Sequence, residues 1–325
     1  MKPAPKIDEY NVGGSMNQSV TGCVVDETTG EPLTSPDVRL YRIGVVGETR
    51  TPLNEHGCFA FSGLPEGEYS LAFYDRKYVP RYERLTLAQV QIMNPLYIAL
   101  KSGGFLSGKI LDEEQRPPEL CHFSLIRAGE RRGESGYISD SGDHEVSGDG
   151  TFCSPPLRPA RYFLRFAGIL RKPADAVPTE PRHLAMQRRV FDYLYPDAQD
   201  ISDAKGFDLQ LGQTISGLQI QIPRPVWHTV RGKITGELPT GPHRINVMFS
   251  RTMGTIDVIG GGGGPKMEQD GTFEYHVQSG DYTVEVWEFA PPEPDGRTSV
   301  LRKFASANIR VTDADLDGIE IHIPS

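Results

Sequence analysis

The side chains best placed to do chemistry are carboxylates that recur at alternate positions near the C-terminus. The chain there reads TDADLDG, in which Asp313, Asp315 and Asp317 match the first half of a D-x-D-x-D-G calcium loop. The bidentate Glu expected at the twelfth position of such a loop is replaced by Pro324. A Ca²⁺ site at these three aspartates is therefore one hypothesis, and a solvated turn between two strands is the other.

A second acidic segment is the loop ISDSGDHEVSGDG, which contains Asp140, Asp143, Glu145 and Asp149. Oxygen ligands this close together can hold Ca²⁺ loosely. Charged runs also favour contact with water, so a solvated loop is the alternative. We expect no obligatory cofactor, and Ca²⁺ is the one candidate ion.

The common catalytic motifs are missing from the sequence. None of the eight His residues has a Glu three positions later, and H-E-x-x-H, G-x-S-x-G and P-loop sequences are absent. The Gly run VIGGGGGPKM (258–267) lacks the Gly-Lys-Ser/Thr ending of a phosphate loop, so we interpret it as a tip between two strands. The net charge of −9 disfavours a nucleic-acid partner, because phosphate contacts need a basic face. We predict that the protein is not an enzyme.

Four cysteines raise the question of disulfides. They are Cys23, Cys58, Cys121 and Cys153, two in each of the first two repeats described below, but at positions that are not equivalent between the repeats. Cys23 and Cys58 both lie out of phase with neighbouring core residues, so a Cys23–Cys58 bridge is one alternative. The other alternative, which we expect, is that the cysteines are buried or idle thiols.

The elements that position these residues are strands, because one sequence pattern occurs three times. The three phrases are NEHGCFAFSGLPEGEYSLAF, SGDGTFCSPPLRPARYFLRF and MEQDGTFEYHVQSGDYTVEV. Each has a turn ending in Gly, a Phe two residues later, and a Tyr that starts an alternating apolar run. Each is preceded by a segment with a central Gly between apolar residues, SVTGCVVD, FLSGKILD or TVRGKITG. Period-two alternation predicts about seven strands per repeat, each strand with one buried face.

We therefore predict an all-β fold of three tandem immunoglobulin-like or prealbumin-like antiparallel β-sandwich domains. The 35 Gly and 26 Pro residues agree with a chain rich in turns. The predicted segments are a flexible tail at 1–18 and domains at 19–102, 103–225 and 226–325. The second domain carries an inserted loop at 167–206, in which PRHLAMQRRVFDYLYP is expected to form a short amphipathic helix after Pro181.

The first repeat resembles a known family. The order G-x-V-x-D, T-G-E-P-L, V-R-L, G-x-F and L-P-x-G-x-Y within residues 22–69 is similar to the carboxypeptidase regulatory-like domain, a prealbumin-like sandwich related to the pilin B-type repeat. The segment 191–222 also resembles the tyrosine-proline connection of such modules in secreted acidobacterial proteins. This resemblance implies a non-catalytic module of an exported protein, located in the periplasm, on the cell surface or outside the cell.

Apart from this resemblance, the sequence does not determine the compartment of the protein. No segment approaches the ~20 apolar residues of a membrane helix, so we expect a chain that is not transmembrane as given. The polar start lacks the apolar stretch of a signal peptide, and a start of this kind also follows a removed signal or anchor.

Binding is then the remaining kind of function, and alternation selects a surface for it. Trp287, Phe163 and Tyr74 occupy matching positions whose side chains are expected to point away from the core. Exposed aromatic rings can stack on a sugar; packing between domains is the alternative explanation. We therefore expect a scaffold or recognition module for glycans or cell-surface proteins. The other hypothesis is an accessory subunit or sensor for an enzyme or outer-membrane system encoded on another chain.

Overall fold

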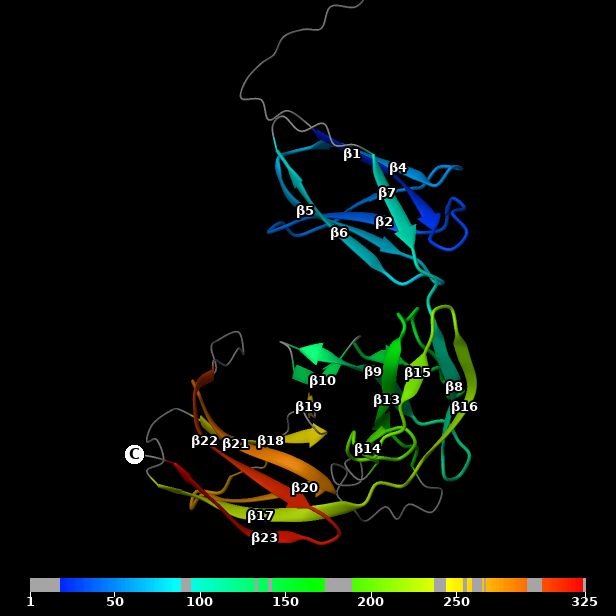
Figure 1. Cartoon of the computed structure of the whole chain (residues 1–325). Helices are drawn as coiled ribbons and strands as arrows, with labels where there is room; N and C mark the ends of the chain where they lie inside the picture. The colour runs from blue at the N-terminus through cyan, green and yellow to red at the C-terminus, as the bar shows by residue number, and fades with distance from the viewer. Residues whose placement is uncertain are drawn as a thin grey trace, which may run out of the picture. The chain divides into compact units, whose positions relative to one another are not determined.

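The computed structural model describes residues 18–88, 95–131, 134–139, 142–172, 189–236, 244–253, 256–258, 265, 267–290 and 300–323. All the named elements in these ranges are strands, so the predicted all-β class is confirmed (Figure 1). Among the described residues there is no helix of the length and apolarity needed to span a membrane.

The chain divides into two compact units, and each is described below by itself. The first is Met1–Leu106 with Ser154–Pro159 and Leu209–Ile215, and the second is Ser107–Cys153, Ala160–Asp208 and Ser216–Ser325. The domain boundaries at 102 and 225 stay a prediction. Most of the tail predicted at 1–18 lies outside the described residues. We call the strand sets β1–β7, β8–β16 and β17–β23 repeats 1, 2 and 3.

Repeat 1 is a sandwich of two sheets around one core. Its strands are β1 Gln18–Asp26, β2 Asp37–Arg42, β3 Thr49–Thr51, β4 Cys58–Leu64, β5 Gly67–Tyr74, β6 Arg81–Leu87 and β7 Leu96–Leu100. They form a three-stranded sheet in the order β4-β1-β7 and a four-stranded sheet in the order β3-β2-β5-β6. Alternate residues of both sheets, such as Val24, Leu40, Phe59 and Leu71, are buried in one cluster.

Repeat 3 has the same topology. Its strands are β17 Trp227–Gly236, β18 Arg244–Met253, β19 Ile256–Val258, β20 Thr272–Gln278, β21 Gly280–Phe289, β22 Val300–Val311 and β23 Leu316–Ile323. The sheet orders are β20-β17-β23 and β19-β18-β21-β22, which correspond strand for strand to those of repeat 1. The Gly run predicted as a tip between strands lies largely outside the described residues.

Repeat 2 keeps the three-stranded sheet and enlarges the other. Its strands are β8 Phe105–Asp112, β9 Leu120–Arg131, β10 Glu134–Ser139, β11 His144–Glu145, β12 Thr151–Cys153, β13 Ala160–Ile169, β14 Val190–Leu194, β15 Phe207–Leu209 and β16 Thr214–Ile222. One sheet is β12-β8-β16; the other is β10-β9-β13-β14, with β11 paired to β9 and β15 paired to β13.

The inserted segment of repeat 2 differs from the prediction. Residues 181–188 of the expected helix lie outside the described residues, and Val190–Leu194 form β14, so the helix does not extend over them. Residues 190–194 form a strand because they pair with the edge of β13 in antiparallel register, with Val190 opposite Ile169 and Leu194 opposite Arg165.

The glycine that opens each repeated phrase has a positive φ, of 71° at Gly57, 86° at Gly150 and 85° at Gly271. In each repeat its carbonyl accepts a hydrogen bond from an amide of the first strand, at 2.8–2.9 Å. A Cβ at Gly271 would lie 2.5 Å from the carbonyl oxygen of Ile234, so no larger residue fits without moving the strand.

The tyrosine of each phrase lies in the core, and in repeats 1 and 3 its hydroxyl bonds back to the chain just before it. Tyr69, Tyr162 and Tyr282 are all buried. The hydroxyl of Tyr69 donates to the carbonyl four residues before it, that of Pro65, at 2.7 Å, and Tyr282 donates to Gln278 in the same way at 2.9 Å. This is the tyrosine-corner arrangement known from β-sandwiches. The repeated phrase is therefore an architectural element in which both Gly and Tyr have structural roles.

The glycine hydrogen bond gives the first prediction. Gly271→Ala places a Cβ against Ile234 and requires a positive φ, so we expect a loss of ~3 kcal/mol or more in the free energy of unfolding. Gly318→Ala is the matched control, since Gly318 has φ +77° and an added Cβ would have no atom within 4 Å; it should cost roughly 1 kcal/mol. Denaturant unfolding of both variants measures the difference. Equal losses would contradict the role assigned to the clash.

Candidate functional site

The outer face of the four-stranded sheet of repeat 1 carries a row of side chains that runs across all four strands. The register places Arg50 of β3 opposite Arg39 of β2, Arg39 opposite Ala72 of β5, and Ala72 opposite Tyr82 of β6. Ala72 is 0% exposed although it points away from the core, because it lies between two larger neighbours. Because Ala72 is small, the side chains of Arg39 and Tyr82 on either side have room to pack over it.

Tyr82 is the most exposed member of this row. The residue is 59% exposed, and its ring is packed edge-on against Tyr74, with centroids 5.9 Å apart and planes at 85°. Partial burial, together with a hydrogen bond to Tyr74, raises the pKa of Tyr82 to about 12. Tyr82 therefore combines an edge-on contact to Tyr74 with a largely exposed position on the sheet.

Arg39 orders the other side of Tyr74. Its guanidinium lies 4.9 Å from the centre of the Tyr74 ring, in a cation–π contact. Its Nε also donates to Asp37 at 2.7 Å. Tyr74, which the sequence predicted to point away from the core, is therefore half-buried beside Arg39 and not freely exposed.

Glu48 joins the remaining polar groups of the face. It accepts a hydrogen bond from the hydroxyl of Tyr41 at 2.7 Å and one from Nε of Arg50 at 2.6 Å, and it lies 3.4 Å from Arg39. The hydrogen bond from Tyr41 is the main cause that lowers the pKa of Glu48. The polar side chains next to the tyrosine pair are consequently held in fixed positions before any ligand arrives.

The sequence did not single out Tyr82 or this network. Tyr82 lies in a strand whose repeat pattern is weak, and its partner Tyr74 is eight residues earlier in the chain. The signal that finds the pair is the cross-strand register, which follows from the hairpin between β5 and β6.

Phe163 is not an exposed aromatic residue, and this expectation was wrong. It is 5% exposed and packs with Ile126, Leu194, Ala198 and Ile201. The segment that follows β14 folds over this face of the sheet and covers the ring. The alternation correctly placed Phe163 outside the main core, but the inserted segment supplies a second, smaller core there.

Trp287 lies on the outer face of the four-stranded sheet of repeat 3, where it is half-buried. Its indole N–H donates to Glu285 at 3.0 Å, and the ammonium of Lys303 lies 5.9 Å from its ring centre. Lys303 also pairs with Glu285. Glu285 thus occupies the edge of the indole ring and Lys303 lies beside the ring, so Trp287 is less accessible to a ligand than Tyr82.

The three C-terminal aspartates are engaged with protein groups. Asp315 accepts the amide hydrogen of Thr229 at 2.8 Å, and this bond is the main cause that lowers its pKa. Arg231 lies 3.1 Å from Asp317 and 3.5 Å from Asp315. Asp313 accepts from the hydroxyl of its neighbour Thr312. The guanidinium stands where a cation would bind, which argues against the Ca²⁺ hypothesis.

The second acidic loop is likewise not gathered around an ion in its described part. Asp140 lies outside the described residues. Glu145 belongs to β11, which pairs with β9, and Asp149 accepts hydrogen bonds from the amide and hydroxyl of Thr151. Within the described ranges, no group of three or more His, Cys, Asp or Glu side chains is placed to hold a metal ion.

Among the hydroxyl–imidazole contacts of repeat 3, the serine–histidine pair has the spacing of a nucleophile and a base. Nε2 of His228 lies 3.1 Å from Oγ of Ser279. The Ser279 hydroxyl, however, donates its hydrogen to the carbonyl of Thr312. Its proton is therefore not directed at His228, and we interpret the pair as a structural hydrogen bond.

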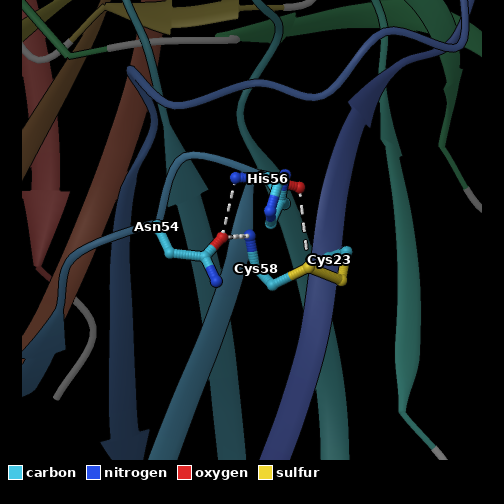
Figure 2. The surroundings of a disulfide bond; sticks show 4 residues. All are labelled: Cys23, Asn54, His56 and Cys58. Carbon is cyan, nitrogen blue, oxygen red and sulfur yellow. Dashed lines mark hydrogen bonds between the residues drawn. A yellow bond between two sulfur atoms is a disulfide. The ribbon is translucent and has the colours of Figure 1, made fainter.

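Cys23 and Cys58 form a disulfide across β1 and β4, where they are directly opposite each other (Figure 2). Oδ1 of Asn54 accepts the amide hydrogens of His56 at 3.0 Å and Cys58 at 2.8 Å, which fixes the turn before β4. The expectation of idle thiols was wrong for this pair. Alternation placed both side chains outside the core, and their opposition depends on a strand register that the sequence did not supply.

The other two cysteines are thiols. Cys121 is buried, and this burial raises the pKa of its thiol to about 12. Cys153 is exposed.

No protein-family model matches the chain, and no curated protein matches it. The resemblance to the carboxypeptidase regulatory-like domain therefore rests on the sequence motifs alone.

Solved structures do align with the chain. The Bacillus anthracis TIE protein aligns at 13% identity and a TM-score of 0.24, over 94% of this chain but only 51% of that one. BcpA, the major pilin subunit of Bacillus cereus, aligns at 10% identity and 0.23, over 95% and 100%. A DUF3823 family protein from Bacteroides ovatus aligns at 14% identity and 0.22, over 47% and 90%. These values are too low to transfer a function or a partner.

The disulfide gives the second prediction. Loop closure over a sequence separation of 35 residues predicts a contribution of about 2–4 kcal/mol to the stability of repeat 1. Reductant should therefore lower the unfolding midpoint of the wild-type chain, and Cys23→Ser/Cys58→Ser should show the low midpoint with or without reductant. Cys153→Ser is the control and should behave as wild type. If complete reduction of the disulfide leaves the unfolding midpoint of the wild-type chain unchanged, the stabilising role assigned to the disulfide is refuted.

Proposed function

We propose that this chain is a non-enzymatic, extracytoplasmic recognition protein whose first repeat binds a saccharide on the face that carries Tyr82 and Tyr74. The observation that carries the proposal is the exposure of Tyr82, which is 59% exposed while its ring packs edge-on against that of Tyr74. A flat ring presented by a rigid strand is the surface on which the apolar face of a pyranose stacks.

The surroundings of the ring support a polar, hydroxyl-rich ligand. Arg39, Arg50, Asp37 and Glu48 border the tyrosine pair and hold one another through ion pairs of 2.7–3.6 Å and one shorter contact between Arg50 and Glu48. Such groups both donate and accept hydrogen bonds, as sugar hydroxyls require. Because they are already ordered, binding costs little side-chain entropy.

The shape of this face agrees with recognition rather than catalysis. The neighbouring depression, lined by Thr34, Pro36, Thr51 and Leu53 together with Asp37 and Arg50, is an open surface feature and not an enclosed site. An open face accommodates a chain that continues in both directions, such as a polysaccharide. Enzymes bury their reacting groups in concave pockets.

The disulfide supports a location outside the cytoplasm. Disulfides persist in oxidising compartments, and reducing systems remove them from cytosolic proteins. The Cys23–Cys58 bridge lies in the same repeat as the proposed binding face. The compartment where the bridge is stable is also the one where cell-surface polysaccharides are found.

The third prediction tests the platform. Tyr82→Ala should weaken binding to the polysaccharides that the wild-type chain retains on a glycan array. Stacking of nucleobases on aromatic rings is worth ~1–3 kcal/mol, and a similar contribution here implies a rise in Kd of roughly 5- to 150-fold. Tyr97→Ala is the matched control, because Tyr97 is 69% exposed on the other sheet of the same repeat. Its affinity should equal that of the wild type.

Trp287→Ala tests whether the binding site lies on the outer face of repeat 3 instead of repeat 1. If this variant loses binding while Tyr82→Ala retains it, the site belongs to repeat 3 and the proposal for repeat 1 fails. If the wild-type chain binds no polysaccharide on the array, saccharide recognition itself is refuted.

A further inference from the structure

Arg84 lies beside Tyr82 on the tyrosine-bearing face of repeat 1. The two residues are two positions apart on β6, the outer strand of its sheet, and both are exposed. The next residue, Leu85, is buried in the core, so alternation turns Tyr82 and Arg84 to the same outer face. Ser70 of β5 lies directly opposite Arg84 in the register. An aromatic ring, a guanidinium and a hydroxyl are therefore neighbours on this part of the sheet.

The other arginines of this face are paired with carboxylates. Arg39 lies 2.7 Å from Asp37, and Arg50 pairs with both Asp37 and Glu48. Arg84 differs from them, because no carboxylate lies within ion-pair distance of its guanidinium among the residues that the structure describes. The positive charge next to the Tyr82 ring is thus available to a ligand, while the carboxylates Asp37 and Glu48 are already neutralised.

Glu68 is the carboxylate that the register places diagonally from Arg84. It is exposed, and it lies opposite Thr86 on β6, two positions from Arg84. Diagonal neighbours on a sheet are roughly 7–8 Å apart, and a charge at this distance in water acts only weakly. Glu68 therefore reduces the attraction of Arg84 for an anion without cancelling it, which makes Glu68 useful as a second test position.

The separation of Tyr82 and Arg84 fits a sugar that carries a carboxylate. Side chains two residues apart on one strand are roughly 6.6 Å apart. When a pyranose stacks on an aromatic ring, the exocyclic carboxylate of a uronic acid projects past the edge of the sugar, towards a group at such a distance. A guanidinium donates two parallel N–H bonds to a carboxylate. A neutral hexose has a hydroxymethyl group at the same carbon, and this group makes no use of the charge.

We infer that the saccharide bound by repeat 1 is acidic, with Arg84 binding the carboxylate of a uronic acid while Tyr82 stacks on the same sugar ring. The inference rests on the proposed function and adds to it the class of ligand and the residue that selects it. The net charge of −9 does not oppose this contact, because salt screens charges beyond about 8 Å at physiological ionic strength.

The test is isothermal titration calorimetry of the full chain with short oligomers of galacturonate, mannuronate and glucuronate, and with the methyl ester of each. The esters keep the sugar ring and remove the charge. The wild-type chain should bind at least one acidic oligomer more tightly than its ester. This preference should shrink as salt is added, because the contact with Arg84 is exposed.

Variants of the face separate the charge from the fold. Arg84→Gln should raise the Kd for the acidic oligomer roughly 3- to 10-fold and leave the weaker binding of the ester unchanged. Glu68→Gln should lower the Kd for the acidic oligomer. Lys101→Gln is the matched control, because it removes the same charge from a side chain that is 59% exposed directly after β7, on the other sheet. It should bind as the wild type does, whereas Tyr82→Ala should weaken binding of both oligomers.

Three results would overturn the inference and leave the proposed function in place. The first is binding of neutral saccharides without preference for any acidic oligomer over its ester. The second is a preference for the acid that Arg84→Gln retains. The third is tighter binding of sulfated dextran than of all three uronates, which would assign Arg84 to sulfate esters. If no saccharide of any kind binds, the proposed function fails and the inference fails with it. Unchanged thermal unfolding of Arg84→Gln shows that a loss of affinity reflects the surface and not the fold.

Discussion

The hydrogen bond between a first-strand amide and the carbonyl of a positive-φ glycine is the contact that the rest of each repeat depends on. It joins Val24 to Gly57, Ile110 to Gly150 and Ile234 to Gly271, at 2.8–2.9 Å each time. Because the contact fixes where the first strand meets the following turn, it sets the register of the three-stranded sheet. A one-residue slip would move every core side chain to the solvent face, so this single register determines which residues are available for binding.

The strands and their faces were predictable because alternation with period two is a local property. β8 has the bounds of the predicted segment FLSGKILD, and the Phe and Tyr of each repeated phrase are buried. The contacts between strands were not predictable in the same way. The opposition of Cys23 to Cys58 depends on the pairing of β1 with β4, which is a long-range property of the folded chain.

The candidate site was predictable only in part, for the same reason. Alternation correctly placed Tyr74 on an outer face, but it carries no information about what lies across the sheet. Tyr82 reaches Tyr74 because Ala72 between β2 and β6 is small, and Phe163 is covered because the inserted segment returns over its sheet. Arg231 of β17 pairs with Asp315 in the turn before β23 and with Asp317 in β23, and these ion pairs also join segments distant in sequence. In each case the deciding neighbour is distant in sequence.

The three repeats show how one architecture presents different surfaces. Core and corner positions are restricted by packing, so Gly and Tyr occur at the same places in all three phrases. Outward positions are not restricted in this way. The arginine opposite the tyrosine of the phrase is buried in repeat 3, as Arg251, and exposed in repeat 1, as Arg42, although its glycine and tyrosine neighbours are the same. Function in such a chain is therefore to be sought at outward positions where the repeats differ, and the shared phrase identifies the scaffold from which those differences are measured.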